Sequence, residues 1–193
     1  MIKSEKQITF AQLNTLSSYI NSAEDLNTLL AYIMNSAKEI IDCEATSLIL
    51  LDEKSKTLKF HVITGEDKEI LTKQSFPMGT GIAGLVAGTC EAVISNDAQS
   101  DDRVFQEIDE ISNFKTNNLL CVPMKVRNKI IGVLEAINAT KGHFTEDDKT
   151  LLAFLANEAA IAIHNRLLFS RLDKANQELN SRIAELKYLY ELT

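Results

Sequence analysis

The spacing of apolar residues predicts two helices at the start of the chain. Residues 5–20 carry apolar side chains at helical intervals, at Ile8, Leu13, Leu16 and Ile20. This spacing is typical of an amphipathic helix. A second stripe follows over residues 26–41, where leucine and isoleucine recur at the same intervals. Ser22 and Asp25 precede it with the spacing of a capping box, so we expect the second helix to begin just after them.

From residue 43 onward, shorter apolar runs indicate strands. Residues 46–51 form a β-leaning run, 52–56 are polar, and 58–63 alternate between apolar and polar side chains. Two such runs joined by a polar turn predict a hairpin. A polar helix is expected over 66–75, and a brief strand at 92–94.

The second half repeats the hairpin and ends in a helix. Residues 119–126 and 130–137 flank a short polar turn and predict a second hairpin. Between the strand at 92–94 and this hairpin, residues 97–118 are polar and acidic, with apolar residues at helical spacing in the middle. We expect residues 97–118 to form a loop with its own short helix that covers another part of the domain, and we call it the covering segment.

The last helix is expected to begin near residue 145 and to continue to the end, because no glycine or proline interrupts it. Its later apolar positions follow a heptad seam with one stutter, at Leu168, Leu172, Ala175, Leu179, Ile183, Leu186 and Tyr190. A helix of this length extends beyond one domain, so the seam is expected to pair with a second copy. The pattern predicts an α+β fold: an antiparallel sheet of about five to six strands, helices on one face, an N-terminal helix and a long C-terminal coiled-coil helix.

Residues 78–84 hold three of the seven glycines of the chain. Glycine lets the backbone turn tightly and approach a ligand closely. If Ile82 and Ala83 begin a helical turn, their free N–H groups form an anion site. The same glycines would also suit a plain corner between a strand and a helix, so both interpretations stay open from this stretch alone.

Charge and composition narrow the function classes. The net charge is −7 and no segment gathers basic residues, which argues against nucleic acid or an anionic membrane as a partner. No apolar run approaches the length of a membrane span, and the start lacks a signal peptide. Cys43, Cys90 and Cys121 have no disulfide or metal spacing and the histidines are isolated, so we expect a reduced, cytoplasmic chain without metal or cofactor.

Several segments together resemble the GAF domain, a ligand-binding sensor module. They fall in family order at 78–84, 93–98, 120–124, 131–135 and 144–148. The resemblance implies an N-terminal helix over 1–24, a GAF sensor domain over 25–169 and a coiled-coil linker over 170–193. Within the family, residues 97–121 are most similar to the cyclic-nucleotide-binding GAF domains of phosphodiesterases and adenylate cyclases, at Phe105, 109–110, Phe114, Thr116 and Asn118.

This resemblance implies a nucleotide pocket. Ser47, Ile63 and Thr64 would face the base, while the backbone of Gly81, Ile82 and Ala83 would hold the cyclic phosphate. The covering segment would contribute Phe105, Asp109, Ser112 and Thr116, and Glu135 would complete the ribose or base side. An unpaired carboxylate in an apolar strand is costly, so Glu135 is expected to have a partner, unless it faces solvent.

Two departures from the family pattern matter. The motif residues Asn138, Phe144 and Asp148 are present, but Ala139 replaces the usual lysine, so the Lys–Asp bridge is lost unless Lys141 supplies it. Thr64 stands where cGMP-selective relatives carry an aspartate, and a hydroxyl can donate or accept. This favours cAMP, with cGMP as the second ligand.

The expected function is a cAMP-sensing regulatory module that forms a homodimer through its N- and C-terminal helices. Because the helical pattern stops uncapped at 191–193, an output domain such as a diguanylate cyclase or histidine kinase is expected to follow. Alternatives are a GAF domain for another small molecule, or one that only dimerises. A methionine sulfoxide reductase is disfavoured because the three cysteines are 47 and 31 residues apart and not clustered. A tetrapyrrole-binding site is disfavoured because residues 97–118 contain no cysteine next to a histidine.

Overall fold

A computed structural model describes residues 26–64, 68–112 and 114–191. The helix expected over 5–20 and its neighbouring capping box lie outside these residues. The elements are α2 (Leu26–Ile41), β1 (Cys43–Asp52), β2 (Thr57–Thr64), α3 (Lys68–Leu71), β3 (Ser75–Pro77), α4 (Gly81–Thr89), β4 (Val93–Ser95), α5 (Gln106–Ser112), β5 (Leu119–Val126), β6 (Lys129–Ala139) and α6 (Glu146–Glu191).

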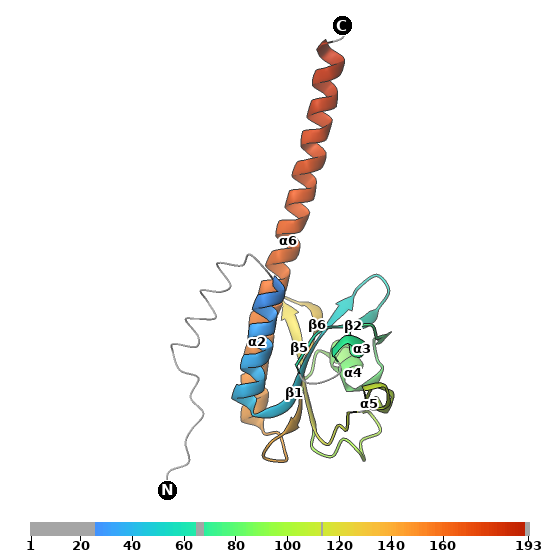
Figure 1. The fold of residues 1–193 in the computed structure, drawn as a ribbon, viewed down its shortest axis with the longest axis vertical. Helices are drawn as coiled ribbons and strands as arrows, with labels where there is room; N and C mark the ends of the chain where they lie inside the picture. The colour runs from blue at the N-terminus through green and yellow to red at the C-terminus, as the bar shows by residue number, and fades with distance from the viewer. Residues whose placement is uncertain (1–25, 65–67, 113, 192–193) are drawn as a thin grey trace.

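The strands form one antiparallel sheet in the order β3-β2-β1-β6-β5-β4. Both predicted hairpins are confirmed, as β1–β2 and β5–β6, and the α+β fold is confirmed with them (Figure 1). The helix expected over 66–75 is wrong in length. Helix α3 has four residues, because residues 75–77 extend along β2 as the edge strand β3.

Helices cover both faces of the sheet (Figure 1). The sequence predicted helices on one face. That face is the one where the long helices α2 and α6 pack against Leu48, Leu120 and Leu134. Their strand neighbours Ile49 and Val133 point to the opposite face, where the short helix α4 packs. This explains why the central strands read as nearly continuous apolar runs, since both of their faces are buried.

Helix α6 has 46 residues and leaves the domain as a single projecting helix (Figure 1). At 1.5 Å per residue it is about 69 Å long. Its first part is buried as far as Ile163, whereas the seam residues Leu168, Leu172, Leu179 and Ile183 are exposed. The side chains of Leu186 and Tyr190 lie outside the described part of the structure.

A stretch of α6 is also apolar enough, by length and composition, to cross a membrane. However, 39% of that stretch is buried inside the domain, and core helices of soluble proteins share this composition. It is therefore weak evidence for a membrane span.

Candidate functional site

A cavity lies between the sheet and the short helices on the face away from α6. It encloses about 830 Å³ of empty space, its open mouth included. Aromatic and aliphatic side chains make up most of the lining. All eleven residues named as ligand-binding from the sequence line it: Ser47, Ile63, Thr64, Gly81, Ile82, Ala83, Phe105, Asp109, Ser112, Thr116 and Glu135.

The first turn of α4 forms one wall of the cavity. Thr80 is the N-cap residue, and its carbonyl accepts the N–H of Gly84 at 3.0 Å. The amides of the next three residues, Gly81, Ile82 and Ala83, have no partner within the helix. The Thr80 hydroxyl does not cap them. Three backbone donors and the positive end of a helix dipole therefore meet the cavity.

The glycines of this stretch allow two close approaches. Gly81 has φ +66°, and a Cβ there would lie 2.8 Å from Cβ of Phe105. A Cβ on Gly84 would lie 2.7 Å from the backbone nitrogen of Gly79. The glycines thus let the loop fold back onto α4 and let the covering segment rest on the loop. The close approach of this backbone to a ligand stays a prediction, because both of these contacts are within the protein.

The covering segment closes the cavity opposite the sheet. Its Phe105 ring packs against Phe76 with centroids 5.8 Å apart, and Phe76 packs against Phe60 at the same distance. The predicted short helix is confirmed as α5. These rings give the cavity an apolar wall that fits the flat face of a ring-shaped ligand.

Asp109 and Thr116 join the helix of the covering segment to the end of that segment. The Asp109 carboxylate accepts the Thr116 backbone N–H at 2.8 Å and the Thr116 hydroxyl at 2.7 Å. The Ser112 hydroxyl donates to the carbonyl of Ile108 at 2.7 Å. All three side chains line the cavity. The Asp109–Thr116 bonds hold α5 to the segment that follows it, whereas the Ser112 bond lies within α5. Their first role in the structure is therefore to shape the cover.

The sheet floor carries a buried carboxyl group. Glu135 is 7% exposed, and the Ser47 hydroxyl donates to its Oε2 at 2.5 Å. Burial raises the pKa of Glu135 to about 7, and the hydrogen bond from Ser47 opposes this rise only in part. Cys121 pairs with Glu135 across the sheet, and burial followed by the Glu135 charge raises the pKa of its thiol. The expectation of a partner for Glu135 is confirmed, and the solvent-facing alternative is wrong.

Thr64 is tied to the neighbouring strand. Its hydroxyl accepts the Thr46 N–H at 2.8 Å and lies 2.8 Å from the Thr46 hydroxyl. The Thr46 hydroxyl donates to the carbonyl of Met34 at 3.1 Å, and the Thr64 hydroxyl lies 3.4 Å from the carbonyl of Thr46. Between the two hydroxyls, either oxygen can be the donor. That Thr64 can donate to or accept from a ligand stays a prediction.

The titratable side chains that line the described part of the cavity are acidic. Among the described residues that line it, Asp109 and Glu135 are the titratable ones, and none is lysine, arginine or histidine. No group of three or more potential metal ligands is found in the described part of the chain. Among the described lining residues, the positive end of α4 is therefore the feature that favours a negatively charged ligand.

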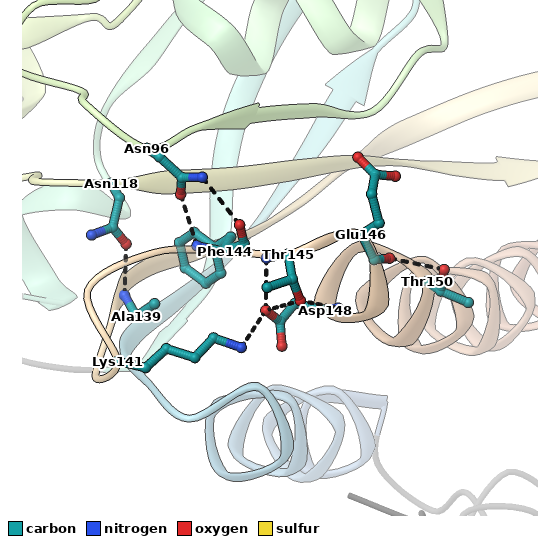
Figure 2. Close-up of polar contacts among 9 residues, drawn as sticks. All are labelled: Asn96, Asn118, Ala139, Lys141, Phe144, Thr145, Glu146, Asp148 and Thr150. Atoms are coloured by element: carbon teal, nitrogen blue, oxygen red, sulfur yellow. Dashed lines mark hydrogen bonds and ion pairs between the residues drawn. The ribbon is translucent and has the colours of Figure 1, made fainter. Parts of the chain in front are cut away.

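The motif residues Asn138, Phe144 and Asp148 lie at the turn between β6 and α6, away from the cavity lining. Lys141 takes the place of the missing lysine, with its Nζ 2.6 Å from Oδ2 of Asp148 (Figure 2). Burial acts to raise the pKa of Asp148, but hydrogen bonds from Lys141 and Thr145 outweigh it and hold the pKa below its usual value. The doubt about this bridge is thus resolved in favour of Lys141.

Two asparagines, one at each end of the covering segment, form hydrogen bonds to this turn, and the sequence predicted no role for them. Asn96 exchanges two hydrogen bonds with the backbone of Phe144, at 2.7 and 3.1 Å (Figure 2). Asn118 accepts the Ala139 N–H at 2.7 Å and donates to the carbonyl of Gly142 at 3.2 Å. Asn138, with φ +57°, accepts the N–H of Asn117 at 2.7 Å. Their positions at either end of the polar stretch were the available signal.

The chain is similar to known proteins over most of its length. A family model described as the GAF domain matches residues 25–163. The probable 3′,5′-cyclic phosphodiesterase pde-5 of Caenorhabditis elegans is 26% identical over 196 residues, covering 97% of this chain and 27% of the relative. The dual 3′,5′-cyclic-AMP and -GMP phosphodiesterase 11A of Takifugu rubripes is 31% identical over 183 residues, covering 89% and 20%. The chain thus spans less than a third of either relative.

A solved structure gives the same fold. The GAF domain of the phosphoenolpyruvate-protein phosphotransferase of Acinetobacter superposes with a TM-score of 0.70 at 25% identity. The superposition covers 85% of this chain and 99% of that one.

Proposed function

Because the chain belongs to the GAF domain family, we propose that its cavity binds a cyclic nucleotide and that the domain senses it as a regulatory module. The observation that carries this proposal is the first turn of α4, where Gly81, Ile82 and Ala83 line a mostly apolar cavity and their amides have no partner within the helix. A cyclic phosphate carries one negative charge, and a helix start with unpaired N–H groups stabilises such a charge without an arginine. The similarity to two cyclic-nucleotide phosphodiesterases supports the same ligand class.

The proposed ligand is cAMP, with cGMP as the weaker one. Thr64 lines the cavity near the site expected for the base, and its hydroxyl can donate or accept a hydrogen bond. Adenine can donate one hydrogen bond from its amino group to such an acceptor. Guanine presents adjacent donors at N1 and N2, which a carboxylate would satisfy better than a single hydroxyl.

The regulatory output is proposed to pass through α6. Its exposed seam residues Leu168, Leu172, Leu179 and Ile183 would pair with the same residues of a second copy, because an unpartnered apolar stripe gains stability in a coiled coil. A diguanylate cyclase or kinase domain following α6 would receive the signal. Sedimentation equilibrium should then show a dimer, and a monomer at high concentration contradicts this step.

Calorimetry with cAMP and cGMP on the wild-type chain tests the ligand class. We expect binding of both, with cAMP tighter. The absence of heat with either nucleotide at millimolar concentration would reject the cyclic-nucleotide proposal and leave the alternatives, another small molecule or a dimerisation module.

A variant at Thr80 tests the phosphate position. Thr80→Asp should keep the helix intact, because aspartate is a favoured N-cap residue. Its carboxylate would occupy the α4 amides and repel the phosphate, so cAMP affinity should fall by at least tenfold. Thr80→Ala is the matched control, since the native hydroxyl makes no capping bond that could be lost. Equal affinity in both variants places the phosphate elsewhere.

A further inference from the structure

No described side chain that lines the cavity around Glu135 carries a positive charge. From β1 it faces Ser47, and from β5 the thiol of Cys121. Across the cavity, α5 contributes the carboxylate of Asp109, and α4 contributes its backbone amides. On β2, Thr64 lines the cavity while His61 is exposed to solvent and lies outside the lining. No described cation therefore compensates an ionised Glu135 within the cavity.

The buried carboxyl has one hydrogen bond that can stabilise its charge. Ser47 donates to Oε2, and no described donor reaches the other oxygen. Burial already brings the pKa of Glu135 to about 7 without a ligand. The group therefore exchanges its proton in the neutral pH range, where a small change in its surroundings decides its charge.

A ligand changes those surroundings in one direction. It displaces water from the cavity, which removes solvation from the carboxylate. It also brings a negative phosphate into the same low-dielectric space, and a nearby like charge disfavours ionisation. Both effects favour the protonated carboxyl, whose O–H can then donate a hydrogen bond to the ligand.

We infer that Glu135 takes up a proton when the cyclic nucleotide binds, so that this pocket binds its ligand together with one proton. The inference rests on the proposed function and adds a pH dependence to it. By linkage, affinity is constant where Glu135 is already protonated and falls as the pH rises above about 7, by up to tenfold per pH unit. The site would then respond to the nucleotide and to pH together.

Calorimetry in buffers of different ionisation enthalpy measures this proton directly. With wild-type protein and cAMP at pH 8, we expect uptake approaching one proton per ligand, and at pH 5.5 uptake near zero. The cyclic phosphodiester and the adenine ring do not titrate in this range, so the proton must enter the protein. Binding with no uptake at pH 8 would overturn the inference and leave the proposed function standing. No binding at all would overturn both.

The variant Glu135→Gln tests whether Glu135 is the residue that takes up the proton when cAMP binds. This variant mimics the protonated carboxyl, so its cAMP affinity should be the same at pH 6 and pH 8, with no uptake. Glu91→Gln, at an exposed site, should keep the wild-type uptake. Uptake that persists in Glu135→Gln contradicts the assignment. If that variant fails to fold, carboxyl ¹³C NMR of the wild-type complex at pH 7.5 gives the same decision: a protonated Glu135 supports the inference and an ionised one overturns it.

Discussion

Replacing Glu135 by glutamine should remove a pH-dependent penalty from the stability of the ligand-free domain. The folded state holds the Glu135 proton more tightly than the unfolded chain, because burial raises its pKa from 4.5 to about 7. Between these two pH values the folded state binds more protons, so the unfolding free energy of the wild type falls as the pH rises. Above pH 7 this penalty is complete, and below 4.5 it is absent.

The size of the effect follows from the shift. Each pKa unit corresponds to about 1.4 kcal/mol, so the full penalty is on the order of 3 kcal/mol. Glutamine does not titrate, so its unfolding free energy lacks this contribution at every pH. A constant offset between the two side chains, such as an unsatisfied amide N–H, cancels when two pH values are compared. We expect the variant to gain about 2–3 kcal/mol relative to the wild type between pH 5 and pH 8.

Urea unfolding followed by circular dichroism at pH 5, 6, 7 and 8 measures this difference. Glu91→Gln serves as the control and should show no such gain, because its side chain is exposed. A difference between Glu135→Gln and wild type that stays constant from pH 5 to pH 8 would refute the reasoning. It would mean that the carboxylate is solvated in the folded state.

Three further substitutions test other parts of the structure by urea unfolding. Gly84→Ala should cost about 1–3 kcal/mol because its Cβ meets the backbone of Gly79, whereas Gly88→Ala, with open space around its Cβ, should be neutral or stabilising. Lys141→Met should cost about 1–2 kcal/mol at pH 7, because Asp148 is buried. This loss should fade as the pH falls through the lowered pKa of Asp148, below 3.8, where the carboxylate becomes protonated. Lys149→Met, whose partner Glu146 is exposed, should cost less than about 1 kcal/mol. Asn118→Ala should cost about 1–3 kcal/mol and speed hydrogen exchange at the Ala139 amide, and Asn117→Ala should do neither. Equal losses in any pair would contradict the role assigned to its first member.

The sequence was sufficient to predict those helices and strands in which the spacing of apolar residues shows the buried face. The alternation of 58–63 predicted β2, and the stripe over 26–41 predicted α2, because in both cases the buried face appears in the spacing. It was insufficient for β3. Residues 75–77 are too few to show a period, and they extend because β2 offers them an edge.

The site was predicted through resemblance, whereas its internal hydrogen bonds were not. Position by position, the family pattern led to residues that all line one cavity. It did not show that Asp109 is engaged with Thr116, or that the hydroxyls of Thr46 and Thr64 are hydrogen-bonded to each other. Such pairings depend on side chains brought together from different elements, which no local spacing records.

The asparagine contacts provide a route from the cavity to α6. Asn96 and Asn118 stand at the two roots of the cover, and the Ala98 N–H donates to the carbonyl of Asn117 between them at 2.9 Å. Both asparagines bond to the turn that leads into α6 (Figure 2). In the proposed sensor, movement of the cover therefore acts on the start of that helix.

Helix α6 would carry this movement outward as a single element. It contains no glycine or proline between residues 146 and 191, so it has none of the usual sequence causes of a sharp kink. A rotation at its first turn would therefore reposition the exposed seam at Leu172 and Ile183. The free energy available for this change cannot exceed the difference in ligand affinity between the open and closed states of the cover. A weakly selective ligand would fill the cavity and leave the helix unmoved, so affinity alone does not measure signalling.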